Sequence, residues 1–514
     1  MRAVILLALM VLTACGYPSP VQLQATAQVA GCWPYGFPRP NPTRTPVGVP
    51  TPSVTPTTAT AMPTCTPAPE TPTLTPTIPP TLTPWTRPTD RPPLDTTSQL
   101  INVSNMPGAD SHAAVALHPS EGWAALAWVN VPPDAPDQAV VYVKAQDART
   151  KAWRRGVSVT TQPAYGFASH PDLAIDEQGH IHAFFGQDPL KPHYSRSTDG
   201  GQTWTEPEAL PLPAGYAPNA LYGRIAVDPA GHLHVFYALE TGAPDSFAYI
   251  HLQRPADADP GTPWHVDTGI FPGEKHVRLA IAFVPLANGQ VRTVAVTGCN
   301  RGCGAAQPIV ATQEGSRPWR VATIPGATDR MPEQNINWTS ALSFRDRSGQ
   351  QQVCIAWGNY AASGTFASCS RDGGRSWGAA ETIVFTPATE DEAISDRGST
   401  PELIYEPTSD TLMAVQIYRQ AGTPATTYVV YSYRHAAAKV WLPIMDGPTE
   451  THEPALRLFP QTRRSLADAN AGIRVAYAGS GLALAAWSEL EADENGDVYL
   501  GWFNPSSLLA EVAP

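Results

Sequence analysis

The chain has 514 residues and a formal net charge of −12, with 15% charged residues. This acidic balance, without any cluster of basic residues, excludes nucleic acid as an expected partner. Prolines are densest between residues 33 and 94, so the composition divides the chain into a Pro/Thr-rich segment and a longer part of globular composition.

The N-terminus has the form of a secretory signal. A basic start, Met1-Arg2, precedes an apolar stretch from Ala3 to Leu12 that is too short to span a bilayer as a helix. The sequence Leu12-Thr13-Ala14-Cys15 that ends it resembles a bacterial lipobox. The resemblance implies a lipoprotein signal peptide over residues 1–14 and acyl chains on Cys15 as the only membrane anchor. An ordinary signal peptide with an incidental cysteine is the alternative.

Residues 15–97 are predicted to form a lipidated N-terminus and a disordered linker. Runs such as Pro72-Thr73-Leu74-Thr75-Pro76-Thr77 recur with almost no charge. Proline at this density disfavours helices and central strands, and too little of the segment is apolar to bury a core. We expect an extended stalk, partly polyproline II, with a rise of about 3 Å per residue.

The part from 98 to 514 is built on internal similarity. Asp172–Phe185 and Arg224–Tyr237 share an apolar strand, a glycine-containing turn and a second strand with period-two alternation. Weaker copies begin at Val115, Leu279, Leu342, Leu403 and Val475. Most copies are followed by a third strand, a polar turn and a tryptophan, which is the pattern of a β-propeller blade.

Two of the polar turns match one another closely. Both follow Ser-x-Asp-x-Gly-x-Ser/Thr-Trp, a pattern that suits a tight turn, since the aspartate accepts amide hydrogen bonds and glycine supplies positive φ angles. The pattern resembles the Asp-box (BNR repeat) of sialidase-like β-propellers, and it implies a structural role. The residues are Ser197, Asp199, Gly201, Trp204, Ser370, Asp372, Gly374 and Trp377.

We therefore predict an all-β fold, a propeller of seven four-stranded blades. Six sets are complete, whereas the set beginning at Arg474 supplies only three strands before the chain ends. The run Leu100–Val103 precedes the first set and is predicted to add the missing outer strand, which would close the ring. Six blades, the number in sialidases, is the alternative.

The cysteines are predicted to form disulfides, as expected in an oxidising compartment. Cys354 and Cys369 lie in two strand-like runs whose hairpin midpoint is near residue 361. The other candidate pairs are Cys299 with Cys303 and Cys32 with Cys65. A zinc site at Cys299 and Cys303 is the weaker alternative, because no second ligand pair has suitable spacing.

Paired histidines invite a metal interpretation, but their positions argue against it. His180 and His182 occupy the same places in one repeat as His232 and His234 in the next. They are therefore predicted to be features of the repeat, and we expect no metal and no cofactor.

The mouth of the central channel is the predicted ligand site. The residues just before the seven apolar strands share this face, and five of them are charged: Asp172, Arg224, Arg278, Glu402 and Arg474, beside Ala114 and Ala341. The arginines would bind an anionic ligand, or Asp172 with Arg224 and Glu402 with Arg474 would form ion pairs. Loops that lead to this face add aromatic side chains, among them His170, Tyr222 and Trp338.

The resemblance to sialidases implies three arginines, a tyrosine nucleophile with a glutamate, and an aspartate acid. The chain departs from that pattern, because the order of the charged residues differs and no tyrosine can be assigned, so the catalytic residues are unknown. We expect a monomeric, extracytoplasmic lipoprotein on a bacterial cell membrane, whose propeller binds glycans or protein partners without catalysis. A divergent sialidase-type hydrolase acting on acidic sugars is the alternative.

Overall fold

A computed structural model describes the repeat region of the chain with several gaps. The described residues are 100–104, 106–135, 138–164, 170–187, 191–241, 247–271, 279–299, 307–327, 336–359, 364–385, 401–420, 426–442, 456–459, 473–477, 481–490 and 496–512. The predicted signal peptide, the linker, Cys15, Cys32 and Cys65 lie outside them.

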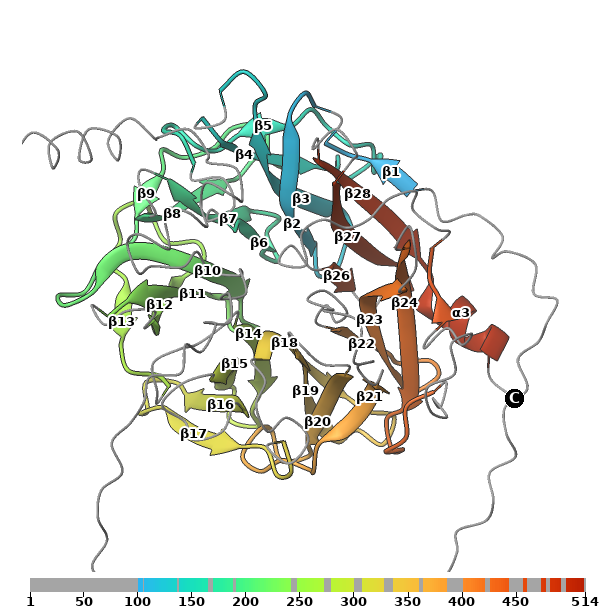
Figure 1. Cartoon of the computed structure of the whole chain (residues 1–514). Helices are drawn as coiled ribbons and strands as arrows, with labels where there is room; N and C mark the ends of the chain where they lie inside the picture. Colours follow the sequence, from blue (N-terminus) through green and yellow to red (C-terminus); the bar gives the residue numbers. More distant parts are fainter. Residues whose placement is uncertain are drawn as a thin grey trace, which may run out of the picture. The chain divides into compact units, whose positions relative to one another are not determined.

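Seven four-stranded sheets surround a central axis, so the seven-bladed propeller is confirmed and the six-bladed alternative is wrong (Figure 1). In each blade the strands are antiparallel and run outward in order. Blade 1 is β2 (Ala109–Leu117), β3 (Ala124–Val131), β4 (Val140–Ala145) and β5 (Val157–Ser158). Blade 2 is β6 (Asp172–Ile175), β7 (Ile181–Gln187), β8 (Lys191–Ser197) and β9 (Glu208–Ala209), and blade 3 is β10 (Ala217–Val227), β11 (His232–Glu240), β12 (Phe247–Pro255) and β13 (His265–Asp267).

The next three blades follow the same plan. Blade 4 is β14 (Ala280–Pro285), β15 (Val291–Cys299), β16 (Gln307–Glu314) and β17 (Arg320–Thr323). Blade 5 is β18 (Ile336–Arg345), β19 (Gln351–Asn359), β20 (Gly364–Ser370) and β21 (Glu381–Phe385). Blade 6 is β22 (Glu402–Glu406), β23 (Thr411–Gln420), β24 (Thr426–His435) and β25 (Leu456–Arg457).

Blade 7 joins the two ends of the propeller. It contains β26 (Arg474–Tyr477), β27 (Ala483–Leu490) and β28 (Gly496–Phe503), and its outermost strand is β1 (Leu100–Asn102). Leu100 pairs with Gly501, and Val103 N–H donates to the Val498 carbonyl at 3.0 Å. The closing strand predicted from Leu100–Val103 is thus confirmed, and it covers the edge that β28 would otherwise expose.

Blades pack on one another through side chains. One buried cluster contains Ala125 and Val143 from blade 1 together with Ile181 and Phe185 from blade 2, each at most 2% exposed. Second and third strands are covered on both faces by neighbouring blades, so small and branched apolar residues recur there. Fully burying each larger apolar side chain contributes roughly 1.5–3 kcal/mol.

A C-terminal helix is an element that the sequence analysis did not predict. Helix α3 (Pro505–Val512) follows β28. Leu508 and Leu509 are each 4% exposed and join the buried cluster of blades 6 and 7. The Ser506 hydroxyl donates to Glu406 at 2.8 Å. The helix therefore adds apolar cover to the two blades nearest the C-terminus.

Candidate functional site

The topology gives the propeller two distinct faces. Because strands alternate in direction, innermost strands begin at one face, and the turns that join first to second and third to fourth strands lie at the other. These are termed the channel face and the turn face below. The predicted mouth residues begin innermost strands, as Asp172 begins β6 and Glu402 begins β22.

Four charged side chains meet at the channel face and are termed the mouth network: Asp172, Arg224, Glu402 and Arg474. Nitrogen atoms of Arg224 lie 3.6 Å from an oxygen of Asp172 and 3.8 Å from one of Glu402, and Arg474 lies 3.2 Å from Glu402. The four side chains are only 9–16% exposed. Blades 3 and 6 are not neighbours, so the pair between Arg224 and Glu402 crosses the channel.

Further hydrogen bonds fix the mouth network. Oδ2 of Asp172 accepts a hydrogen bond from the backbone N–H of Ile225 at 3.0 Å. Nε of Arg224 donates to the Leu279 carbonyl at 2.8 Å. Oε2 of Glu402 accepts the Ser340 hydroxyl at 3.1 Å. These contacts tie blades 2 to 6 together, so the network stabilises the ring as well as lining its channel.

The structure brings together both ion pairs that the sequence suggested, Asp172 with Arg224 and Glu402 with Arg474. Burial lowers the pKa of the Arg474 guanidinium, and the nearby Arg224 lowers it further. Two arginines and two carboxylates balance in charge, which weakens the case for an anion site built from these four. Arg278 lies outside the described residues, as does the side chain of Trp338 on β18.

Three rings line up beside the mouth network and are termed the ring row: His112 on β2, His170 before β6, and Tyr222 on β10. Ring centroids are 4.2 Å apart for His112 and His170, nearly perpendicular, and 4.7 Å apart for His170 and Tyr222. Each ring stands two residues before a mouth position (Ala114, Asp172, Arg224). The ring row therefore crosses blades 1 to 3 at the channel face.

Backbone strain accompanies the ring row. His112 and Tyr222 have φ angles of 55° and 57°, in the left-handed region that bulky residues rarely adopt. Both lie at register shifts, between Ser111 and Ala114 in β2 and between Leu221 and Arg224 in β10. Strain of this kind persists where the surroundings enforce it, and it is concentrated at functional sites.

The paired histidines brace hairpins. His180 and His182 lie 2.9 and 3.4 Å from Oδ2 of Asp176, the residue that follows the first strand of blade 2 and begins the turn to the second. Burial works to raise the pKa of Asp176, but the hydrogen bonds from His182 and the His180 backbone lower it below its usual value. In blade 3, Asp228 receives its two histidines in the same way. The aspartate partners were missed in the sequence.

Blade 3 adds a third histidine, His251, to this arrangement. Nδ1 of His234 lies 3.0 Å from Nε2 of His251, whose Nδ1 lies 3.0 Å from Asp267. Burial lowers the pKa of His251 to about 4. Asp267 also accepts hydrogen bonds from Gln313 and Trp319 of blade 4, at 3.1 and 3.2 Å. This largely buried chain of hydrogen bonds joins two blades.

The two Ser-x-Asp turns lie at the turn face, away from the mouth network. In the first, Oδ1 of Asp199 accepts the Gln202 and Thr203 amides at 2.9 Å each. Burial works to raise the pKa of Asp199, but these bonds and those from the Thr203 and Ser197 hydroxyls lower it to about 2. Gly201, with φ +84°, donates its N–H to the Ser197 hydroxyl at 2.8 Å.

The second turn repeats this geometry. Asp372 accepts the Arg375 and Ser376 amides at 2.9 Å each, and Gly374 donates to the Ser370 hydroxyl at 2.7 Å. Its tryptophan, Trp377, is buried in a cluster that spans blades 4 and 5. Trp204 packs likewise against the cluster of blades 1 and 2. All of these contacts are structural.

An arginine from the preceding blade holds each turn. Arg154 donates to the carbonyls of Asp199 and Gly200 at 3.0 and 2.9 Å. Arg292 donates likewise to Asp372 and Gly373 at 3.0 and 2.7 Å. A Cβ on either glycine would lie 2.6 or 2.5 Å from the guanidinium. The first glycine of each turn therefore leaves room for the arginine and also supplies a positive φ angle.

The blade 2/3 junction contains a buried ion pair with an indole. Arg254 donates to both oxygens of Glu208 at 3.1 and 2.9 Å, and its guanidinium lies 3.8 Å from the Trp264 ring centroid. Trp264 also donates to Glu208 at 2.8 Å. Arg196 crosses from blade 2 to the carbonyls of Ala256 and Ala258. The junction is filled by these groups.

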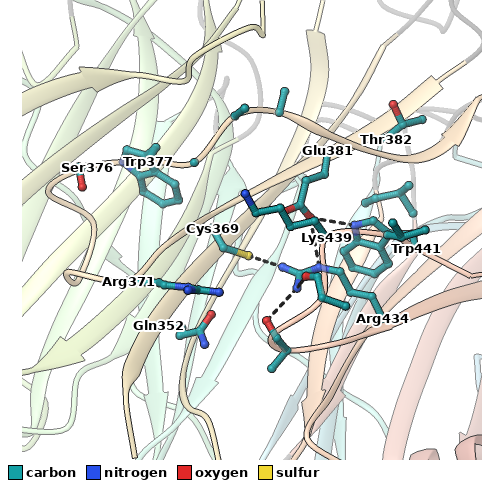
Figure 2. A pocket seen from close by; sticks show the side chains of 17 residues that line it. Gln352, Cys369, Arg371, Ser376, Trp377, Glu381, Thr382, Arg434, Lys439 and Trp441 are labelled. Carbon is teal, nitrogen blue, oxygen red and sulfur yellow. Dashed lines mark hydrogen bonds and ion pairs between the residues drawn. The ribbon is translucent and has the colours of Figure 1, made fainter. Parts of the chain in front are cut away.

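The blade 5/6 junction uses equivalent residues but leaves a groove of about 730 Å³ (Figure 2). Arg434 lies 3.2 Å from Glu381, and Trp441 donates to the same carboxylate at 3.3 Å. Burial raises the pKa of Glu381 in spite of Arg434. Arg371 and Lys439 also line the groove. Sequence reasoning did not predict this groove, because no motif marks an unfilled space.

Cys369 lines the groove and forms a disulfide with the buried Cys354, which faces it across β19 and β20. Nη2 of Arg434 lies 2.8 Å from the sulfur of Cys369. Cys303 and the side chain of Cys299 lie outside the described residues, so that pairing stays a prediction.

Two general searches bear on site chemistry. Over the described ranges, no three histidine, cysteine, aspartate or glutamate side chains lie where they would hold a metal ion. In the same part of the chain, no helix has the length and apolar character needed to cross a membrane.

Comparison with known proteins gives structural matches only. No protein-family model and no curated protein sequence matches the chain. An ulvan lyase of polysaccharide lyase family PL25 is 11% identical, with a TM-score of 0.45 over 81% of this chain and 100% of that chain. Trypanosoma rangeli sialidase in complex with sialic acid is 10% identical, with a TM-score of 0.38 over 66% of this chain and 57% of that chain. A Dyadobacter fermentans protein of unknown function is 13% identical, with a TM-score of 0.42 over 77% and 94%. At such identities, evidence on function has to come from this chain's own residues.

Proposed function

We propose that the propeller binds a saccharide at the channel face, across blades 1 to 3, and does not hydrolyse it. The observation that carries the proposal is the ring row, in which His112, His170 and Tyr222 from three successive blades are in ring contact. His170 and Tyr222 are half-buried, so part of each ring is open to a ligand.

Rings of this kind suit sugars. A pyranose has apolar C–H faces that stack on aromatic rings, and its hydroxyls accept and donate hydrogen bonds to imidazole and phenol groups. The left-handed backbone at His112 and Tyr222 supports a binding role, since a packed core gains nothing from such strain. A rigid scaffold that presents rings from several blades is a common basis for ligand recognition.

The mouth network favours binding over hydrolysis. A sialidase-type reaction needs arginines that hold the substrate carboxylate and an acid that protonates the leaving group. Here Arg224 and Arg474 are already within ion-pair distance of Asp172 and Glu402. A substrate would have to break these pairs before the arginines could bind it. A sialidase-type hydrolase remains the alternative that the test below separates.

The N-terminal features complete the proposal. Lipidation at Cys15 would hold the protein on the outer side of a bacterial cell membrane, and the Pro/Thr-rich linker would extend the propeller outward. The contacts of the two Ser-x-Asp turns support their assignment to the Asp-box type. Labelling with a radioactive fatty acid tests the anchor: Cys15→Ala should abolish labelling and release the protein from membranes, and a variant that stays membrane-bound would contradict it.

A glycan array with parallel turnover assays on sialosides tests the function. Tyr222→Asn is the variant of choice, because asparagine tolerates the left-handed backbone while the ring is lost. We expect affinity for the glycan that binds the native protein to fall about tenfold, the scale of one aromatic contact.

His265→Ala is the control, since its side chain is 58% exposed on the outer strand of blade 3, and it should bind as the native protein does. Sialoside hydrolysis that survives purification would replace the proposal with the hydrolase. Unchanged glycan affinity in Tyr222→Asn would remove the ring row from the site.

A further inference from the structure

The groove at the blade 5/6 junction is separate from the channel face. Its lining comes from the third and fourth strands of blade 5, the third strand of blade 6, the segments that follow the two third strands, and Gln352 on the second strand of blade 5. These segments lie at the turn face and toward the outside of the ring, where Figure 1 shows β20, β21 and β24. A ligand here would not touch the ring row or the mouth network.

Its open volume has a structural cause. At the blade 2/3 junction, Arg196 reaches the carbonyls of Ala256 and Ala258. The equivalent of Arg196 in blade 5 is Cys369, because each precedes the serine of a Ser-x-Asp turn. Cys369 is held in its disulfide and cannot reach across. Arg434 instead satisfies the carbonyls on the blade 6 side, at 3.0 Å from Ala436 O.

The groove carries two positive charges that are not balanced by carboxylates. Glu381 is engaged by Arg434, at 3.2 Å. Arg371 and Lys439 line the same space and act electrostatically on the same carboxylate, so Glu381 faces three cations, of which the described ion pair accounts for Arg434. Because the protein as a whole carries a net charge of −12, this local excess of positive charge makes the groove a preferred place for an anionic ligand to bind.

We propose that this groove binds an acidic saccharide, with a carboxylate against Arg371 and Lys439. The chemistry of the walls supports a sugar rather than a bare anion. Trp377 and Trp441 lie on either side of the groove in Figure 2 and contribute an apolar border, although their side chains are only 9% and 3% exposed. The exposed Ser376 hydroxyl donates to Asp372, and its oxygen can still accept a hydrogen bond from a sugar hydroxyl. The proposal concerns a second site, so it stands independently of the ring row.

Calorimetric titration of the full-length protein with a tetrasaccharide of galacturonic acid tests the groove. The methyl ester of the same tetrasaccharide is the matched neutral probe, and a tetraglutamate peptide tests an acidic peptide instead. We expect the free acid to bind, the ester and the peptide to bind at least tenfold more weakly, and binding to weaken when ionic strength rises from about 0.05 to about 0.3 M.

Variants locate the site. Arg371→Gln and Lys439→Gln should each weaken binding of the free acid several-fold, and the double variant at least tenfold. Arg375→Gln is the control, because Arg375 is exposed in the same turn but pairs with Glu314 outside the groove lining. Tyr222→Asn should bind this probe as the native protein does.

Three outcomes would overturn the proposal. Equal binding of the ester would show that charge is not recognised, and a loss in Arg375→Gln as large as in Arg371→Gln would indicate unspecific attraction. Tighter binding of tetraglutamate than of the tetrasaccharide would assign the groove to an acidic peptide. Since Arg371, Arg375 and Lys439 are exposed, a circular dichroism melt should show native stability in the variants at these three positions.

Discussion

At the blade 2/3 junction a guanidinium from blade 2 crosses to the neighbouring blade, whereas at the blade 5/6 junction the equivalent residue is a cysteine tied into a disulfide. At the blade 2/3 junction, Nη1 of Arg254 donates to Glu208 and to the Thr262 carbonyl, and Nη2 donates to the second oxygen of Glu208. In the equivalent position of blade 6, Nη1 of Arg434 donates to the carbonyls of Ala436 and Ala438 in its own loop. Arg434 contacts Glu381 only through Nε.

The difference shows how one substitution alters the partners of several other residues. Without an Arg196 equivalent, the carbonyls at the edge of blade 6 take Arg434 as donor, and Glu381 loses a two-point partner. Trp441 still donates to Glu381 across the junction, and both residues line the groove. Repeated architecture thus provides a structural position that one blade pair fills for stability and another leaves available for binding.

The largest loss of stability is expected from the removal of the Arg254 side chain. Arg254→Ala breaks a two-point ion pair that is 3% exposed on the arginine side and removes a stacked cation from Trp264. We expect the free energy of unfolding to fall by about 3 kcal/mol, the low end for a buried pair because Glu208 retains some contact with water. Denaturant titration measures it. Arg317→Ala removes an ion pair whose arginine is 68% exposed and should cost less than about 0.5 kcal/mol; equal losses would contradict the comparison.

The acids of the two junctions should respond differently to neutralisation. Glu208→Gln loses charge-assisted bonds to both Arg254 nitrogens and should cost about 1–2 kcal/mol at pH 7. Glu381→Gln should cost less than about 1 kcal/mol, because burial already disfavours the charged form and raises the pKa of Glu381. Paired denaturation curves test this, and a larger loss for Glu381→Gln would reverse the interpretation of the two junctions.

The raised pKa of Glu381 also predicts that the stability of the protein depends on pH. A folded-state pKa of Glu381 above its ordinary 4.5 means that the folded protein holds this proton more tightly than the unfolded chain does. Protonated Glu381 therefore stabilises the folded state, fully below about pH 4.5, and this contribution is lost as the pH rises through the raised pKa. Native protein should gain stability relative to Glu381→Gln as pH falls from 7 toward 4.5; a difference that stays constant over this range would show that Glu381 is an ordinary ion-pair acid.

Much of the architecture was predictable because it repeats. The similarity of the Asp172 and Arg224 repeats set the blade length, and the short count of strands after Arg474 required a closing strand, which Leu100 begins. Hairpin symmetry likewise placed Cys354 opposite Cys369. The C-terminal helix escaped because it belongs to no repeat.

The sites were less accessible to sequence reasoning. His170 and Tyr222 were visible as aromatic residues near the mouth, but His112 was not, because its position depends on a register shift in β2. The pairing of Arg224 with Glu402 crosses the channel between blades that are far apart in sequence. The groove follows from a side chain that is absent at Cys369, and such an absence is recognised only when two blades are compared in three dimensions.

The weakest binding that we expect tests whether open space alone makes a binding groove. Arg196→Ala removes the guanidinium that donates to Ala256 and Ala258, and it should open the blade 2/3 junction at a cost of about 1 kcal/mol of stability, because water can replace the donor at two partly buried carbonyls. It should not confer binding of the galacturonate tetrasaccharide, because Asp259 occupies the position that Lys439 has in blade 6, three residues after the equivalent carbonyl-bearing Ala256. Adding Asp259→Lys to Arg196→Ala reverses that charge, and weak binding that disappears at high salt is then expected in the same calorimetric titration. Binding by Arg196→Ala alone would mean that volume decides, whereas binding by the double variant and not the single one would show that the cations at the rim select the ligand.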